Sequence, residues 1–465
     1  MPLVAGVDCS TQSTKVLVCD VHSGAVVREG RAPHPDLTEV DPREWWSAWQ
    51  QASSGLLDGV EALAVGGQQH GMVLLDDDGV PVRDALLWND NRSADAAAAL
   101  LAELGGPAAW ADATGSVPLA SFTVSKLRWV AEHEPGVAAR ASAVQLPHDF
   151  LTHRLRAGTD GPTTDRGDAS GTGYWSADAG YRDDLLTLAF GRALQTPRVA
   201  APAEVVGTTT DGVAIAPGTG DNMAAALGLE LQPGDIAVSL GTSGTVFARS
   251  GAQTHDPEGV VAGFADATGG FLPLVCTLNA ARVLQAAVTM AGASLEDLDR
   301  LALSVPDAGG LVLLPYLDGE RTPYLPEATG LLHGLTRHNT TPAHLVRAAV
   351  EGLMCGLADA VDALREQGLP VRRVVLIGGA ARSRAVRRIA GAVLGAEVFT
   401  PDPGEYVALG AARQAAWALS GSAEPPHWSL DGERTLPEDE EARRATGTRE
   451  SYRQVLSRAG DLLEG

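Results

Sequence analysis

The stretch VAGVDCSTQSTKVLVCD, residues Val4 to Asp20, consists of two apolar, β-branched runs joined by a short polar turn. This pattern predicts a β-hairpin. Its Ser- and Thr-rich turn offers backbone N–H groups and hydroxyls at close spacing, which suits a phosphate. A second stretch of the same kind, IAVSLGTSGTVFARSG, spans Ile236 to Gly251. Two phosphate-binding turns in one chain predict two related halves that hold one polyphosphate.

Composition limits the possible partners. The chain has 465 residues, which favours two domains over a single core. Its formal net charge of −23 argues against nucleic acid and against an anionic membrane surface as partners. No apolar run approaches the ~20 residues that a membrane span needs. The N-terminal MPLVAGVDCS has neither a basic region nor a cleavage signature, so we expect no secretory signal and a cytoplasmic location.

The four cysteines lie in apolar segments: Cys9, Cys19, Cys276 and Cys355. None forms a Cys-x-x-Cys pair or stands near a His at metal-ligand spacing, which argues against a zinc site. We expect small buried side chains in a reducing compartment.

Strand and helix patterns alternate in both halves of the chain. Strands are expected at 3–8, 15–20, 25–31, 62–67 and 371–379. Helices are expected at 42–57, 93–104, 123–133, 277–291, 342–367, from 383 onward, and at 407–419. The breaker Gln-Pro-Gly-Asp at 232–235 divides the chain into domains 1–231 and 232–465, and the Pro-, Glu- and Arg-rich segment 420–447 is expected to be a mobile surface segment. Neither a Rossmann Gly-x-Gly-x-x-Gly nor a Walker A sequence occurs at these turns.

Three residues of the first repeat suit phosphate chemistry. Asp8 stands at the end of the first strand, where a carboxylate would hold Mg²⁺ directly or through water. An Asp that only caps a turn is the alternative. Thr11 and Lys15 would approach the transferring phosphate from the same side.

The second half offers two turns with few side chains. Gly241 and Thr242 lie in a turn whose backbone N–H groups can approach nucleotide phosphates closely, although a plain hairpin turn has the same pattern. Gly378 and Gly379 follow a hydrophobic strand and lead to Ser383 at the start of a helix. These small residues would let a flat adenine or ribose lie on the backbone.

In the first half, several polar residues that could bind a sugar lie close together in the sequence. Gln69-His70 follows one apolar run, and WNDNR, beginning at Trp88, follows another; hydrogen-bonding groups beside one Trp suit a polyol. A lone His is commonly structural. Asp221-Asn222 precedes the second repeat, and a buried carboxylate there suits a general base for a hydroxyl that attacks a phosphoryl group. An Asp before the helix-like NMAAALGLEL is also a common N-cap.

These features together resemble the sugar kinases of the FGGY carbohydrate kinase family, which are relatives of actin, Hsp70 and hexokinase. SFTVSKLRWVAEH (121–133) and GLLHGLTRHNTTPAHLVRAAVE (330–351) look like the two signatures of that family. The resemblance implies an α/β fold with two ribonuclease H-like (actin/hexokinase-type) domains flanking an ATP/sugar cleft.

The resemblance also implies an ATP- and Mg²⁺-dependent phosphotransferase that acts on a small-molecule sugar, and homodimers are common in such kinases. The runs WNDNR, QQHG, LPHDFL, DASGT and LPYLDGERTP are similar to runs of the pentulose kinases, so D-xylulose is the expected acceptor. Kinases of ribulose, gluconate or glycerol are alternatives within the family. An actin- or Hsp70-like nucleotide switch is the alternative from another class.

Matching positions carry the family's site residues onto this chain. Asp221 becomes the catalytic base, and Asp8 the residue near Mg²⁺ and the γ-phosphate. The expected sugar contacts are Gln69, His70, Asn222 and Trp88. The expected ATP contacts are Thr11, Lys15, Gly241, Thr242, Gly378, Gly379 and Ser383.

Three positions depart from the family pattern. Ser10 replaces a glycine of the first turn, which costs backbone energy if its φ is positive. Gln69 stands where the pentulose kinases often have Met, which makes the pocket more polar, and Ala380 replaces the third glycine of a Gly-Gly-Gly-Ala-Arg run.

Overall fold

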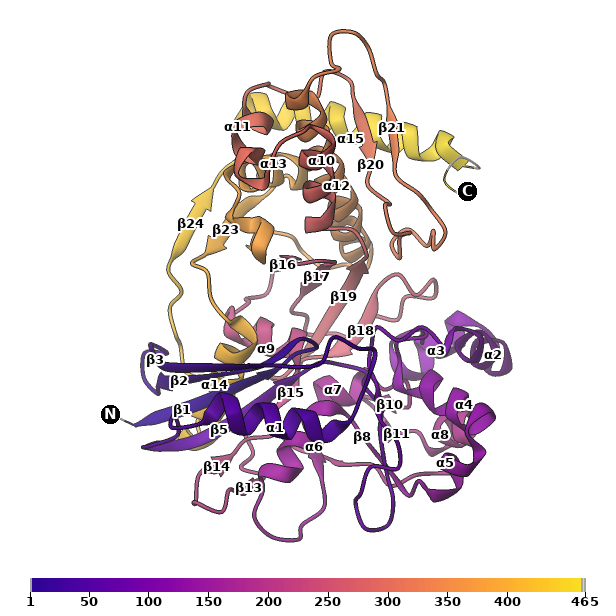
Figure 1. Ribbon diagram of the computed structural model, residues 1–465, viewed down its shortest axis with the longest axis vertical. Helices are drawn as coiled ribbons and strands as arrows, with labels where there is room; N and C mark the ends of the chain where they lie inside the picture. Colours follow the sequence, from indigo (N-terminus) through magenta and orange to yellow (C-terminus); the bar gives the residue numbers. More distant parts are fainter. Residues whose placement is uncertain (1, 461–462, 464–465) are drawn as a thin grey trace. The chain divides into compact units, whose positions relative to one another are not determined.

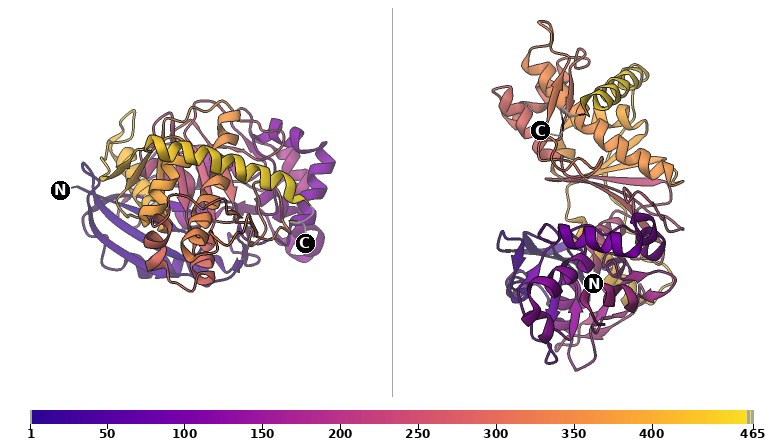
Figure 2. Two further views of the ribbon diagram at one scale, coloured as in Figure 1. Left: turned by 90° about the horizontal axis from the view of Figure 1, so that it is seen from above. Right: turned by 90° about the vertical axis from the view of Figure 1, so that its right-hand side faces the viewer.

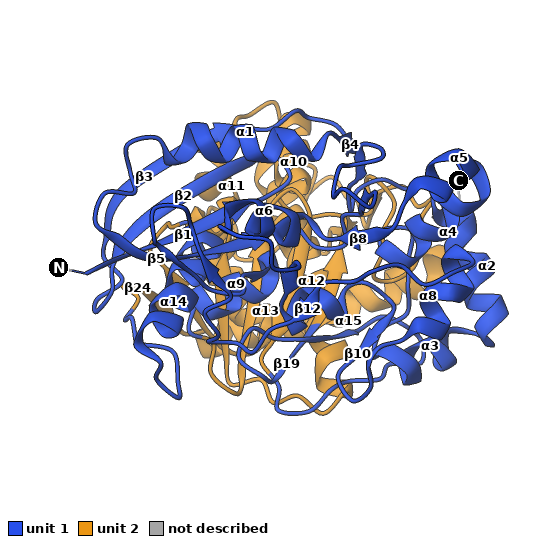
Figure 3. Cartoon of the chain, turned by 90° about the horizontal axis from the view of Figure 1, so that it is seen from below, with its two compact units in different colours: residues 1–230, 250–273, 405–429 blue, residues 231–249, 274–404, 430–465 orange. Residues whose placement is uncertain are grey.

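The computed structural model describes residues 2–460 and 463 and divides the chain into two compact units (Figure 3). The first unit comprises the chain up to residue 230 together with 250–273 and 405–429. The second unit comprises 231–249, 274–404 and 430–465. The division expected at 231/232 lies beside the first crossing, but the chain returns to the first unit twice. Segment 405–429 belongs there because its helix α14 (Tyr406–Ser420) packs on the first sheet.

The first unit is built on a mixed sheet with the order β13-β14-β5-β1-β2-β3 (Figure 1). Its strands are β1 (Leu3–Cys9), β2 (Ser13–Asp20), β3 (Val26–Pro33), β5 (Val60–Gly67), β13 (Gly207–Thr208) and β14 (Ala214–Ile215). The expected hairpin forms between β1 and β2, with Asp8 opposite Lys15. Strand β5 runs parallel to β1, so both strands end at the same edge of the sheet.

The second sheet has the order β18-β19-β17-β16-β22-β23-β24, in which β18 is Ala262–Ala265, and its part from β19 to β24 repeats this topology. Its strands are β16 (Asp235–Leu240), β17 (Gly244–Ala248), β19 (Phe271–Thr277), β22 (Arg373–Ile377), β23 (Glu397–Pro401) and β24 (Gly432–Thr435). Read from β3 and from β19, both sheets pair antiparallel twice, parallel twice and antiparallel once more. The prediction of two related halves is therefore confirmed at the level of topology.

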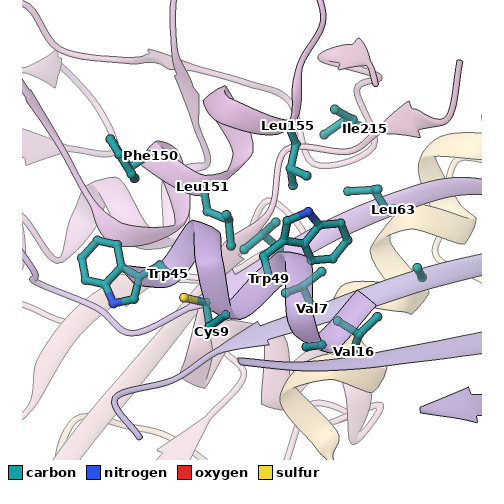
Figure 4. Close-up of a cluster of buried hydrophobic side chains, with 14 of the residues drawn as sticks. Val7, Cys9, Val16, Trp45, Trp49, Leu63, Phe150, Leu151, Leu155 and Ile215 are labelled. Atoms are coloured by element: carbon teal, nitrogen blue, oxygen red, sulfur yellow. The ribbon is translucent and has the colours of Figure 1, made fainter. Parts of the chain in front are cut away.

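Successive side chains of the central strands point to opposite faces of the first sheet, and both faces are covered by apolar residues. Val7 and Cys9 point to a cluster that includes Trp45 and Trp49 of α1 (Pro42–Ser53), as Figure 4 shows. Val4, on the opposite face, joins a cluster made largely of α14 alanines. The apolar residues of α1 recur at helical spacing, so the helix lays one stripe on the sheet.

Further helices of the first unit are α2 (Ala94–Leu104), α3 (Pro107–Thr114), α4 (Thr123–His133), α5 (Pro135–Arg140), α6 (Pro147–Leu155), α7 (Arg166–Ser170), α8 (Asp183–Phe190) and α9 (Asp221–Gly228). Those of the second unit are α10 (Ala281–Met290), α11 (Leu298–Leu303), α12 (Pro342–Glu366), α13 (Arg384–Leu394) and α15 (Asp439–Ala459). Helix α10 begins later than expected because Thr277 ends β19. Across 2–460 and 463, no helix has both the length and the apolar character that crossing a membrane requires.

The segment 420–447 lies largely at the surface, as predicted, but it contains regular structure that was not predicted. Residues Gly432–Thr435 form β24, which pairs with β23, and α15 begins at Asp439 (yellow in Figure 2). Trp428 is buried, and its indole N–H donates to the carbonyl of Val21 at 3.1 Å. The polar composition of the segment does not reveal these contacts, because they depend on Val21 and on β23, which folding brings close.

The first unit tolerates no side chain at Gly6. A Cβ built there would lie 1.9 Å from the Ala408 carbonyl oxygen and 2.3 Å from the Ala412 nitrogen, both backbone atoms of α14. We expect Gly6→Ala to lower the free energy of unfolding by roughly 1–3 kcal/mol or more, because helix and strand must separate. Urea unfolding followed by circular dichroism measures the change.

Gly136→Ala is the matched control, since no atom lies within 4 Å of its Cβ position. We expect its effect to stay within about 0.5 kcal/mol. If Gly6→Ala and Gly136→Ala have the same midpoint of urea unfolding, then α14 does not exclude a side chain at Gly6.

Candidate functional site

Three segments of the first unit end at one edge of its sheet. Strand β1 ends just after Asp8, and β5 ends at Gly67, ahead of Gln69-His70. The short strand β15 (Thr219–Gly220) pairs parallel with the last residues of β5 and leads directly into α9, which begins at Asp221. Because parallel strands direct their carboxyl ends to the same edge, the structure brings these predicted residues together.

Asp8 lies in a network of charged and hydroxyl groups. It is 1% exposed, and its two carboxylate oxygens accept from the Ser10 hydroxyl and from Lys15 Nζ, the latter at 3.3 Å. Lys15 Nζ also contacts Glu405 Oε2 at 2.6 Å, a partner that sequence reasoning missed because it lies 390 residues away. Burial raises the pKa of Asp8, and the Lys15 ammonium only partly offsets that effect. In the described chain Ser10 is not among the residues with positive φ, so the anticipated backbone cost does not arise.

Among the predicted residues, Asp221 has the environment that best suits acid–base chemistry. Burial of its carboxyl, followed by the nearby charge of Asp8, raises the pKa of Asp221 to about 7. Gly220, not Asp221, occupies the N-cap position of α9. The Asn222 side-chain amide donates to Asp221 Oδ1 at 2.9 Å and to Gln69 Oε1 at 3.1 Å. A carboxyl that titrates near neutrality and is held in place suits general-base chemistry.

Gln69 has an unused donor. The side chain is 4% exposed, and within the described residues its Nε2 is buried without a hydrogen-bond partner. A buried polar group left unsatisfied costs about 1–3 kcal/mol. A ligand hydroxyl at this place would remove that cost.

His70 has a constrained backbone and a fixed ring. Its φ of 66° lies in the left-handed region, which a non-glycine residue seldom adopts. The ring Nδ1 donates to the Gly171 carbonyl at 2.6 Å, and the ring stacks on Phe122 with centroids 4.5 Å apart. Strained residues held in this way concentrate at functional sites.

Trp88 lies against the first phosphate-type turn. Its indole N–H donates to Thr11 Oγ1 at 2.8 Å. Further along WNDNR, Arg92 forms an ion pair with Asp90 at 2.9 Å. The bond from Trp88 joins the candidate sugar loop to the candidate phosphate turn within the first unit.

A buried ionisable cluster behind these loops was not predicted. His148 on α6 lies 2.5 Å from Asp168 Oδ2 through Nδ1 and 3.3 Å from Asp149 Oδ1 through Nε2. Asp165, the N-cap of α7, accepts from the Thr219 hydroxyl at 2.7 Å. All four side chains are at most 2% exposed. The runs LPHDFL and DASGT contain three of these residues, but only the fold brings the two runs together.

Burial and mutual charge shift the pKa of each residue in this cluster. Burial lowers the pKa of His148, but Asp149, Asp168 and Asp165 outweigh that effect and raise it to about 9. Burial raises the pKa of Asp149 to about 7 and that of Asp165 to about 6. His148, Asp149 and Asp168 are also residue types that bind metals, with donor atoms within 4.8 Å of one another.

The second unit brings two predicted turns together. The hairpin turn that contains Gly241 and Thr242 joins β16 to β17, and the Gly241 carbonyl accepts from the Ala281 N–H at 3.0 Å. Gly378 has φ 93°, and a Cβ there would lie 2.5 Å from the Leu240 carbonyl oxygen. Gly378-Gly379 therefore lies against the end of β16, next to the hairpin turn.

Ser383 has a structural role of its own. It caps α13, since its Oγ accepts from the Val386 N–H at 3.1 Å and donates to Asp299 Oδ1 at 2.5 Å. Asp299 also accepts from the N–H groups of Arg384 and Ala385. The hydroxyl of Ser383 is thus engaged inside the second unit.

Comparison with known proteins identifies the class. Residues 3–228 match the N-terminal domain of the FGGY family of carbohydrate kinases, and residues 236–419 match its C-terminal domain. The xylulose kinases of Streptomyces rubiginosus and Streptomyces coelicolor are 47% and 48% identical, over 100% of this chain and 98% of each relative. The solved structure of xylulose kinase from Bifidobacterium adolescentis has a TM-score of 0.89 at 43% identity and covers 98% of this chain and 99% of that one.

The chain belongs to the FGGY family of carbohydrate kinases. It is an ATP-dependent sugar kinase, and its substrate is a small-molecule sugar. The family resemblance and the two-domain α/β fold class expected from the sequence are both confirmed.

The bond between Trp88 and Thr11 can be measured by a double-mutant cycle. Trp88→Phe and Thr11→Val each remove it, so each should lower the free energy of unfolding by about 0.5–1.5 kcal/mol. The double variant should lose less than the sum, with a coupling of about 1 kcal/mol. Urea unfolding followed by circular dichroism gives all four values.

The control cycle pairs Trp88→Phe with Thr187→Val, an exposed position on α8. Those two changes should be additive within about 0.5 kcal/mol. Additivity in the Trp88 and Thr11 cycle as well would show that the bond contributes nothing.

Proposed function

We propose that this chain transfers the γ-phosphoryl group of ATP to D-xylulose, forming D-xylulose 5-phosphate in pentose (xylose) catabolism. Full-length identity of 47–48% to two proteins named xylulose kinase carries the proposal. The site chemistry supports it: Gln69 offers a buried, unsatisfied donor, His70 has a fixed ring, and burial raises the pKa of the Asp221 carboxyl to about 7. Such an arrangement suits a polyol with one hydroxyl to be activated.

In the proposed mechanism Asp221 is the general base. Its carboxylate accepts the proton of the sugar's terminal hydroxyl as that oxygen attacks the γ-phosphorus. The new P–O bond forms while the bond to the β–γ bridging oxygen breaks, and ADP carries away the negative charge. Asn222 holds the Asp221 carboxylate and Gln69 in one hydrogen-bonded row. Positioning of this kind supplies most of the catalysis in phosphoryl transfer.

Asp8 is the proposed Mg²⁺ residue, and its chemistry fits. A buried carboxylate at a strand end is an oxygen ligand of the kind that Mg²⁺ prefers, and the ion keeps several waters, so few protein ligands are needed. Mg²⁺ would supply neutralisation of phosphate charge. Lys15 and Thr11 are the proposed phosphate contacts on the same turn, and Glu405 holds the Lys15 ammonium in place.

The second unit provides the proposed nucleotide contacts. Gly241, Thr242, Gly378 and Gly379 would meet ATP through backbone groups, supported by the contact between the two turns. Ser383 would act by shaping the start of α13, because its hydroxyl is bound to Asp299.

We propose domains 1–231 and 232–465, divided at the Gln-Pro-Gly-Asp breaker and supported by family-domain ranges of 3–228 and 236–419. We also propose a cytoplasmic location, and, from the family resemblance, a homodimer. Light scattering of the purified protein tests the dimer.

The pH dependence of catalysis tests the role of Asp221. With a pKa of about 7, its carboxylate form is lost as the pH falls, so kcat/KM should fall about tenfold per pH unit below 7 and level off between pH 7 and pH 9. Asp221→Asn should reduce kcat/KM by about 10²–10⁴-fold. A direct assay of ADP release across pH 5 to 9 records both effects.

Asp178→Asn, an exposed carboxyl of the first unit, is the control and should leave the profile unchanged. A near wild-type rate for Asp221→Asn would show that Asp221 is not the general base.

A panel of acceptors tests the substrate. We expect D-xylulose to have the highest kcat/KM among D-xylulose, D-ribulose, gluconate and glycerol, measured by ADP release. A higher value for gluconate or glycerol would refute the substrate assignment but leave the sugar kinase intact. ATP turnover stimulated by a protein and by no sugar would instead favour a nucleotide switch.

A further inference from the structure

The buried cluster around His148 has no part in the chemistry proposed above, yet it touches the segments of the first unit that lead to Gln69, His70 and Asp221. We propose that His148, as an imidazolium, is a positioning residue: it holds these segments where they can bind the sugar acceptor. The inference rests on the proposed function, since it concerns the same sugar site. It assigns a role to a residue that does not reach the substrate.

The first observation is the place of the ring. A Cβ on Gly67 would lie 2.7 Å from His148 Cβ, and a Cβ on Gly218 would lie 2.7 Å from His148 Cδ2. Gly67 ends β5, two residues before Gln69, and Gly218 lies three residues before Asp221. The imidazole therefore fills a slot between the two backbones that lead into the sugar loop and the base.

The second observation is a link to His70. Asp168, which contacts His148 Nδ1, lies on α7, and its carbonyl accepts from the Gly171 N–H at 2.9 Å. The Gly171 carbonyl accepts from His70 Nδ1. The ring of His148 is thus joined through one short helix to the ring that faces the proposed sugar.

The third observation is the charge around the ring. His148 Nδ1 is hydrogen-bonded to Asp168 Oδ2 at 2.5 Å, and Nε2 lies 3.3 Å from Asp149 Oδ1, close enough for an ion pair but without a hydrogen bond. A neutral ring with its proton on Nδ1 would place the Nε2 lone pair near the Asp149 carboxylate, whereas the imidazolium attracts both carboxylates. In the described part of the chain, neither Lys nor Arg forms an ion pair with Asp149, Asp165 or Asp168.

Among the described titratable groups around the cluster, His148 is the one that can carry a positive charge. Asp149 on α6, Asp168 on α7 and Asp165 at the N-cap of α7 act on it through their charges. Burial holds the pKa of the Tyr174 and Tyr181 phenols above their ordinary range, so both stay neutral. The backbones of β5 and of the turn at Gly218 contribute no titratable group.

A metal ion would explain the same donors less well. Two ligands at ~2.1 Å from one zinc ion in tetrahedral geometry lie well over 3 Å apart. The 2.5 Å between His148 Nδ1 and Asp168 Oδ2 is a hydrogen-bond distance. The cluster is therefore an ion pair network, and loss of its single cation would leave carboxylates of α6 and α7 to repel each other.

The kinetic test compares His148→Gln, which keeps hydrogen bonding but not charge, with His148→Lys, which keeps charge. For the best acceptor of the panel, His148→Gln should raise KM at least tenfold and leave KM for ATP within twofold. His148→Lys should recover at least a third of the wild-type kcat/KM. Wild-type kcat/KM should fall as the pH rises through about 9, and the Lys variant should retain activity to higher pH.

His153→Gln, on the same helix and outside the cluster, is the matched control and should leave both KM values within twofold. An unchanged acceptor KM in a folded His148→Gln, or an equal rise in both KM values, would overturn the proposal.

A substrate-free measurement separates this proposal from the assignment of the sugar. In protein labelled with ¹⁵N-histidine, the His148 ring, assigned by its absence in His148→Gln, should carry protons on both nitrogens at pH 7.5. A neutral ring, or one equivalent of zinc by elemental analysis, would refute the proposal even if the variants have no kinase activity. Failure of D-xylulose in the panel would leave this result unaffected.

Discussion

The parallel pairing of β1 with β5 is the constraint on which the candidate site depends. It sets Asp8 at the end of one strand beside the loop that carries Gln69 and His70, and β15 extends the same edge to Asp221. Helix α14 lies directly on this part of the sheet at Gly6, where there is no room for a side chain. A helix from near the end of the chain thus packs on the strand that begins it.

Buried carboxyls dominate the electrostatics of the first unit. Asp8 and Asp221 both have a raised pKa because they share a desolvated edge, and each feels the charge of nearby carboxylates. Lys15 and His148 are the cations set among these groups. A folded chain tolerates such an arrangement where function requires it, because the cost of burying the charges is offset by packing elsewhere.

Much of the fold was predictable because it is local. The alternation of apolar residues and the turn chemistry defined both hairpins, and the bounds of α4 agree with the pattern at 123–133. In segment 420–447 the contact of Trp428 with Val21 and the pairing of β24 with β23 were not predicted, because composition reveals neither. Local rules cannot show a strand whose partner is distant.

By itself the sequence determined the two hairpins, the repeat of their turns, the candidate residues on them and the family to which they belong. Only the tertiary structure decided which of these residues meet, that Glu405 holds Lys15, and that His148 lies among three carboxylates. The reason is physical: hydrogen-bonding and side-chain periodicity act between near neighbours in the chain, whereas desolvation and charge pairing depend on what folding brings close. A pKa near 7 for Asp221 is a property of that environment, and no motif encodes it.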